Sequence, residues 1–125
     1  MLDLTLSLAK EYRLALRVYD PPLVEKLQAQ GLPADDHSLL DSFTMNIPTK
    51  REHYMLLLRE LPTGLNEWAV HPSTGDTDSQ AVDPGGWEVR QSDYQFLISP
   101  EARDLIQNEG IILLSYRDLQ RVWYP

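Results

Sequence analysis

The run Ile111-Ile112-Leu113-Leu114-Ser115, directly after Gly110, decides the fold class that the sequence predicts. It shows no alternation of apolar and polar residues, and such continuous runs are typical of strands buried on both faces of a parallel sheet. The residues before it begin with a capping serine, Ser99, and end at Gly110, which predicts a helix there. A further helical turn is expected at residues 117–122.

Three more strand candidates precede this run, separated by segments with helical periodicity. Strands that alternate with helices form parallel sheets with right-handed crossovers. The sequence therefore predicts one α/β domain over residues 1–125, with about four mostly parallel strands that form a small open sheet or half of a β/α (TIM-like) barrel. The additional strands are expected at residues 14–18, 39–45 and 65–71, and the helices at residues 3–12, 22–30 and 49–61.

Two helix starts and one long loop are predicted from local signals. Thr49 and Glu52 have the spacing of a capping box, in which each side chain bonds the other residue's backbone. Residues 72–91 are rich in Gly, Asp, Ser and Pro, which favours a long loop. A short helix is expected to start at Ser92, with Gln95 completing a second capping box.

Composition restricts the function classes. The 125 residues include no cysteine, which excludes disulfides, thiolate metal sites and a cysteine nucleophile. The net charge of -8 disfavours nucleic acid and anionic membranes as partners. Most of the excess acidity lies in residues 76–109, and a solvated surface is favoured there over a cation-binding segment. No apolar run approaches the roughly 20 residues that span a bilayer, and residues 1–4 lack a basic signal region, so a cytoplasmic protein is expected.

His71 is the sharpest candidate for chemistry. In parallel α/β sheets, ligands gather at the carboxyl ends of the strands, where His71, Arg17 and Asn46 are expected. An imidazole there, before a long loop, is suited to general acid or base catalysis near neutral pH. A purely structural histidine that caps the strand is an equally good interpretation.

Glu67 is expected on the same face of its strand as His71, roughly 13 Å away at about 3.3 Å per residue. If its side chain is buried it needs a partner, and Arg17 on another strand is a candidate. An exposed, unpaired glutamate is the alternative.

Other side chains give weaker signals. His37 and His53 do not join His71 in any metal-ligand spacing, and surface positions are expected for both. Tryptophans can stack on a sugar but more often serve in packing, and this holds for Trp68, Trp87 and Trp123.

Several stretches, in this order and spacing, resemble the C-terminal half of the YdjC-like carbohydrate deacetylases. The similarity covers nearly the whole chain. The stretches are Ala9-Lys10-Glu11-Tyr12 up to Arg17, Gly64-Leu65-Asn66-Glu67-Trp68-Ala69-Val70-His71-Pro72, Arg90-Gln91-Ser92-Asp93-Tyr94 with Leu97, Ser99-Pro100-Glu101-Ala102-Arg103, and Gly110-Ile111 up to Ser115-Tyr116-Arg117.

This resemblance implies a deformed β/α barrel that uses a divalent metal to remove acetyl groups from N-acetylated sugars. The Asp and His metal ligands of the family lie in its N-terminal half, outside the stretches matched here. The resemblance places His71 near the substrate and aligns Arg17 and Arg90 with family arginines. Ser73 stands where the family has glycine after the His-Pro pair.

The leading hypothesis is therefore a C-terminal fragment of such a metal-dependent deacetylase, inactive alone and not expected to bind the metal by itself. His71 is the catalytic candidate, and N-acetylated sugar is the expected substrate of the intact protein. The alternative is a non-catalytic interaction module, and a homo-oligomer is expected because open sheet edges favour pairing. The substrate-binding candidates are Arg17, Asn46, Glu67 and Arg90.

Overall fold

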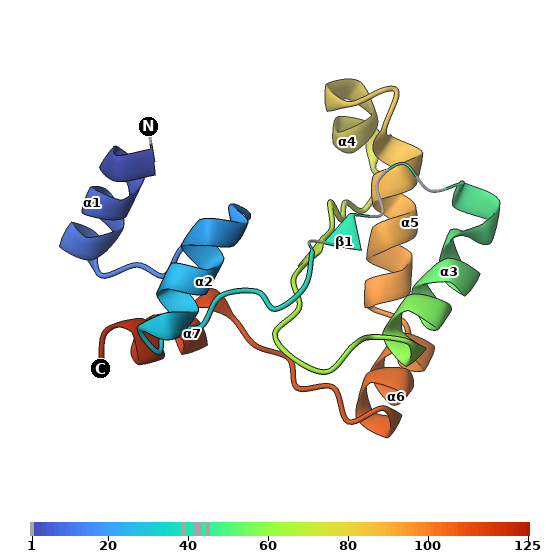
Figure 1. Ribbon diagram of the computed structural model, residues 1–125. Helices are drawn as coiled ribbons and strands as arrows, with labels where there is room; N and C mark the ends of the chain where they lie inside the picture. Colours follow the sequence, from blue (N-terminus) through green and yellow to red (C-terminus); the bar gives the residue numbers. More distant parts are fainter. Residues whose placement is uncertain (1, 39, 42–43, 45) are drawn as a thin grey trace. The chain divides into compact units, whose positions relative to one another are not determined.

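The structure, a computed structural model, describes residues 2–38, 40–41, 44 and 46–125 (Figure 1). Helix accounts for 56% of these residues and strand for 3%. The predicted α/β fold with four parallel strands is therefore wrong. The described elements, in chain order, are α1 (Leu2–Tyr12), α2 (Pro21–Ala29), β1 (Leu40–Asp41), α3 (Ile47–Arg59), β2 (Trp68–Ala69), α4 (Thr77–Val82), α5 (Trp87–Leu97), α6 (Pro100–Asn108) and α7 (Tyr116–Trp123).

The strand predictions failed because the apolar runs lack partners. Strands β1 and β2 form a parallel pair of two residues each, in which Leu40 lies opposite Trp68. Residues 14–18 and 111–115 are irregular, and Ile112 is 80% exposed. A strand buried on both faces needs neighbours on each edge and layers on each side, which no described element supplies to residues 111–115. Of the predicted strand 39–45, residues 39, 42, 43 and 45 lie outside the described residues.

Helices were predicted better, because several begin at a visible cap. The helices expected at residues 3–12 and 117–122 are α1 and α7, and the one at 22–30 is α2, where Asp20 accepts a hydrogen bond from the backbone of Leu23. At the start of α6, Ser99 accepts one from the backbone of Ala102 at 3.2 Å, as its position predicted.

Three local predictions are corrected. Helix α3 begins at Ile47 with Asn46 as its N-cap, so Thr49 lies inside the first turn and the predicted capping box with Glu52 does not form. The stretch predicted as one long loop, residues 72–91, contains α4 and the start of α5. Ser92 therefore lies within α5 and starts no helix.

Residue contacts divide the chain into two compact units. Unit 1 consists of the described residues of 1–39 together with 63–67 and 113–125, and unit 2 of the described residues of 40–62 together with 68–112. The core of unit 1 joins α2 and α7: Trp123 is buried there, and its indole N–H donates to the backbone carbonyl of Pro33 at 2.8 Å. The buried residues of this core are Val18, Leu23, Leu27, Ala34 and Trp123.

In unit 2, helices α3, α5 and α6 pack side by side (Figure 1). Tyr54 is fully buried at the centre of this core. Its ring makes edge-to-face contacts with Trp68 and Phe96, at centroid distances of 4.7 and 5.0 Å. Such aromatic pairs stabilise a core beyond their buried area. The other buried members of this core are Leu58, Ala102 and Leu105.

A buried charge cluster lies beside Tyr54. The ammonium of Lys50 is 2.6 Å from Asp93 Oδ1, and both side chains have 0% exposure. The Tyr54 hydroxyl donates to the same oxygen at 2.5 Å. Because neither charge reaches water, each depends on the other, and the cluster fixes α3 against α5.

Among the described helices, none combines the length and the apolar character that crossing a membrane requires.

Replacing Asp93 by Ala should therefore destabilise unit 2 strongly. The variant leaves the Lys50 ammonium buried without its counter-ion, a loss that costs roughly 3–5 kcal/mol. Urea unfolding would measure this as a change in the free energy of unfolding. The control Glu101→Ala removes the partner of Arg51 in an ion pair whose side chains are 58% and 55% exposed, and should cost less than about 1 kcal/mol. An Asp93→Ala variant as stable as this control would contradict the interpretation.

Candidate functional site

His71 lies just after β2 in unit 2, with an exposed side chain. Its backbone N–H donates to Asp93 Oδ2 at 3.2 Å. The other oxygen of that carboxylate receives Lys50 and Tyr54, so a fully buried cluster holds the backbone at His71. The imidazole is thus presented on the surface from a rigid attachment point.

The segment after His71 runs along α5. The backbone N–H of Ser73 donates to the carbonyl of Arg90 at 3.1 Å, and the side-chain amide of Gln91 donates to the carbonyl of Thr74 at 3.1 Å. Gly75 has a φ of +70°, and a Cβ added there would lie 2.6 Å from Gln91 Nε2. Only glycine suits both this backbone conformation and this close approach.

Two substrate-binding candidates also lie in unit 2. Arg90 is close to the His71 segment through its backbone, while its Nε is 2.6 Å from Asp83 Oδ2 in an ion pair of half-buried side chains. Asn46 is exposed and is the N-cap of α3, where its side chain makes no capping hydrogen bond.

The other two candidates meet in unit 1. The guanidinium of Arg17 forms an ion pair with Glu67 Oε1, and the hydroxyl of Tyr116 donates to Glu67 Oε2 at 2.8 Å. The Glu67 side chain is only 15% exposed and is paired with Arg17, so the alternative of an exposed, unpaired glutamate is wrong. Arg17 itself lies in an irregular segment and not on the predicted strand. Burial and the bond to Glu67 raise the pKa of Tyr116 to about 12. Hydrogen bonds to Glu67 and Tyr116 raise the pKa of Arg17.

Asp35 adds a second carboxyl group to this cluster. Its pKa is raised to about 6, mainly by burial and also by the neighbouring Glu67, while the positive charge of Arg17 acts to lower it. Two carboxyl groups beside one guanidinium cannot both ionise at low cost. The cluster of Arg17, Asp35, Glu67 and Tyr116 can therefore hold a proton near pH 6, and it contains both hydrogen-bond donors and hydrogen-bond acceptors.

Glu67 and His71 do not share a strand face as predicted. Strand β2 contains only Trp68 and Ala69, so neither residue belongs to it. Glu67 is part of unit 1 and His71 part of unit 2. The alternation that the prediction relied on is absent from this segment.

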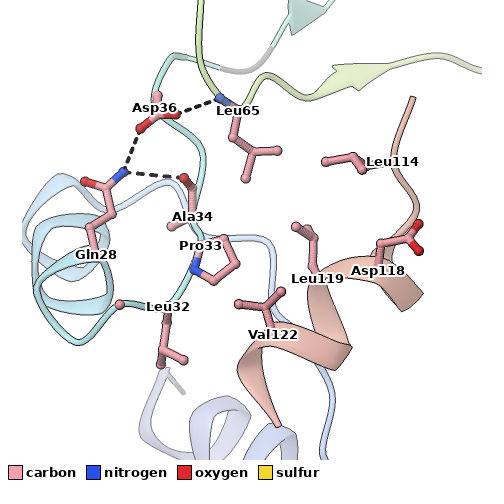
Figure 2. A pocket seen from close by; sticks show the side chains of 11 residues that line it. Gln28, Leu32, Pro33, Ala34, Asp36, Leu65, Leu114, Asp118, Leu119 and Val122 are labelled. Atoms are coloured by element: carbon pink, nitrogen blue, oxygen red, sulfur yellow. Dashed lines mark hydrogen bonds between the residues drawn. The ribbon is translucent and has the colours of Figure 1, made fainter. Parts of the chain in front are cut away.

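Unit 1 also has an apolar recess of about 620 Å³, shown in Figure 2. The polar side chains at its edge are engaged with the protein: Asp36 accepts from Gln28 at 3.1 Å and from the backbone of Leu65 at 2.6 Å. The rest of the lining is mainly apolar, with Leu114, Leu119 and Val122 on one side (Figure 2). The recess offers apolar surface but little polar recognition.

The residues do not fit the divalent metal that the resemblance implies. Within the part of the chain that the structure describes, no three His, Asp or Glu side chains are placed to hold a metal ion. His37 hydrogen-bonds the carbonyl of Thr63 at 3.0 Å, and His53 bonds the carbonyl of Thr49 in its own helix at 2.9 Å. No catalytic step is therefore assigned to a metal here, and the expectation that this chain alone binds none stays a prediction.

The buried residues beside His71 and the carboxyl group beside Glu67 were not identified from the sequence. Lys50 lies one turn before Tyr54 on the apolar face of α3, a spacing that offered a signal for its burial. Asp93 belongs to the acidic region predicted to be a solvated surface, and only its tertiary contacts reveal its role. Asp35 lies in a polar segment with no periodicity, and no sequence signal marked it.

No protein family matches the sequence, and no curated protein is significantly similar to it.

The stability of unit 1 should depend on pH through Asp35. Its pKa of about 6 in the folded protein exceeds the ordinary value of about 3.9, so the folded state binds the proton more tightly. The resulting stabilisation is complete below about pH 4 and is lost as the pH rises through about 6. Thermal unfolding from pH 4 to pH 7 should show a decrease in Tm that is smaller in Asp35→Asn.

Glu25→Gln changes an exposed carboxyl group of α2 and is the matched control. Equal pH dependence of Tm in Asp35→Asn and the wild type would contradict the assignment.

Proposed function

We propose that this chain supplies the C-terminal part of a metal-dependent hydrolase that removes acetyl groups from N-acetylated sugars. The metal-binding part lies outside the residues that carry the resemblance. His71 acts in this proposal as the general acid that protonates the leaving amine. The placement of His71 is the observation that carries the proposal.

That placement meets two requirements of acid catalysis. The donor must reach a substrate atom, and the side chain of His71 is exposed. It must also be held in position, and the backbone of His71 is bonded to Asp93 within a cluster that has no solvent exposure.

The chemistry asked of His71 is specific. In amide hydrolysis the C–N bond breaks as water oxygen bonds to the acetyl carbon, and the nitrogen departs poorly unless it gains a proton. A protonated imidazole can donate that proton to the amine and become neutral, and the proton that the attacking water loses restores the imidazolium. The products are acetic acid and an amino sugar, which ionise to acetate and an ammonium group. The proton-donating histidine is needed mainly in the transition state, so it affects kcat more than substrate affinity.

Arg17, Glu67, Arg90 and Asn46 are the proposed sugar contacts, each within its own unit. Arg17 is 45% exposed and already paired with Glu67, so it can donate to a sugar hydroxyl without leaving a buried charge behind. Asn46 offers an exposed amide with no capping bond. Arg90 is the least available, since Asp83 engages its guanidinium.

A non-catalytic interaction module is the second candidate, favoured by one observation. Leu113 and Leu114 of unit 1 are consecutive and 73% and 55% exposed. Contiguous exposed apolar surface of this kind marks interaction sites in many proteins. A second copy of the chain is the proposed partner, because an irregular apolar segment can pair with its own equivalent.

The variant His71→Ala tests the enzymatic proposal in a protein that also contains the metal-binding part. We expect kcat to fall by about 10²- to 10⁴-fold, the typical contribution of a general acid, with little change in KM. Tm should hardly change, because alanine retains the backbone N–H that bonds Asp93. The chain alone should release no acetate from N-acetylated chito-oligosaccharides.

His53→Ala is the matched control, since it removes an exposed histidine from α3 in the same unit. A His71→Ala variant with unchanged kcat would contradict the catalytic role of His71, whatever the stability of the variant.

Self-association tests the second candidate. We expect light scattering to show a concentration-dependent increase in mass for the chain, and Leu113→Asp to reduce it because a carboxylate is costly to bury in an apolar contact. Val82→Asp places the same charge on another apolar residue, 85% exposed in α4, and should have little effect. A monodisperse monomer at high concentration is the result that would contradict this prediction.

A further inference from the structure

We infer that a groove in unit 2, lined by residues of α3 and α5, binds a short neutral saccharide chain against Trp87. The groove has a volume of about 560 Å³, within the range of ligand pockets. This inference concerns a binding site apart from the residues proposed above, and binding there requires no deacetylation. Saccharide binding in this groove can therefore be tested independently of the catalytic role of His71.

Trp87 provides the aromatic surface. Of the three tryptophans, Trp68 packs against Tyr54, and Trp123 is buried with its indole N–H bonded to Pro33. Trp87, the first residue of α5, is half-buried and lines the groove. The apolar C–H faces of a pyranose ring pack on such a surface, which is both large and rigid.

Polar side chains that suit sugar hydroxyls surround this ring. Gln91 and Gln95 follow Trp87 at intervals of four residues along α5, so all three share one face of the helix. Each amide offers a donor and an acceptor, as does the hydroxyl of Ser92. At about 1.5 Å per residue, the eight steps from Trp87 to Gln95 extend over about 12 Å, which favours a short chain over a single sugar.

The charges of the lining favour a neutral ligand. Arg51 and Glu88 contribute one cation and one anion, and Arg51 is already paired with Glu101. The chain as a whole carries a net charge of -8, which repels phosphate and polyanions. Neutral hydroxyl and acetamido groups meet no such repulsion.

Helix α5 links this groove to His71. Its residues Trp87, Gln91 and Gln95 line the groove, while Asp93 holds the backbone of His71. Gln91 also bonds the carbonyl of Thr74, three residues beyond His71. One rigid helix thus supports both features within unit 2.

Titration calorimetry of the whole chain with two neutral probes, tetra-N-acetylchitotetraose and cellotetraose, tests the inference. We expect saturable binding of at least one probe, with a shift of the Trp87 indole signal in proton–nitrogen NMR spectra. Trp87→Ala should weaken binding about tenfold or more, and Trp87→Phe by less, because the smaller ring retains part of the stacking surface. Gln95→Ala should weaken binding several-fold.

Gln107→Ala is the matched control, since it removes an exposed glutamine of α6 that does not line the groove, and it should bind like the wild type. Circular dichroism of each variant checks that the helices remain folded. No saturable binding of either probe, or equal binding by Trp87→Ala and the control, would overturn the inference. In a protein that also contains the metal-binding part, saccharide binding and acetate release that are both unchanged by His71→Ala would contradict the catalytic proposal and leave this one intact.

Discussion

A carboxylate that water cannot reach governs the organisation of unit 2. Asp93 has three partners from two other parts of the chain: Lys50 and Tyr54 on α3, and the backbone of His71. An unpaired charge in such a position is strongly destabilising, so these segments can separate only at high cost. The mutual register of α3, α5 and the chain after β2 follows from this requirement. Aromatic packing around Tyr54 then fills the remaining volume.

The same constraint explains how the surface of unit 2 can carry function. The imidazole of His71 and the groove lined by Trp87 are both exposed, and exposed side chains usually have freedom to move. Here their attachment points are on or beside α5, which the buried cluster immobilises. Rigid support for exposed groups is what binding and catalysis need, because less conformational entropy is lost when a ligand arrives.

Local signals in the sequence predicted helices but not the way they associate. Asp20 and Ser99 cap their helices through side-chain hydrogen bonds, and this chemistry is fully specified within four residues. The run at 111–115 is different, because burial of a strand depends on partners elsewhere in the chain. Its composition suits a parallel sheet, yet the described residues place no strand beside it. The sequence offered Arg17 as a partner of Glu67 only on the condition that Glu67 is buried, and that burial, like the burial of Lys50 and Asp93, emerges only from packing.

The order of segments along the chain has a consequence for biosynthesis. Unit 2 is built from residues before position 113, so all its parts are available once that position has left the ribosome. The core of unit 1, by contrast, includes Trp123, whose bond to Pro33 joins residues 90 positions apart. The apolar face of α2 therefore cannot be covered by α7 until the intervening chain has been synthesised. All parts of unit 2 are therefore synthesised before those of unit 1 are complete, and helix α2 is a segment whose apolar face a chaperone would meet in the meantime.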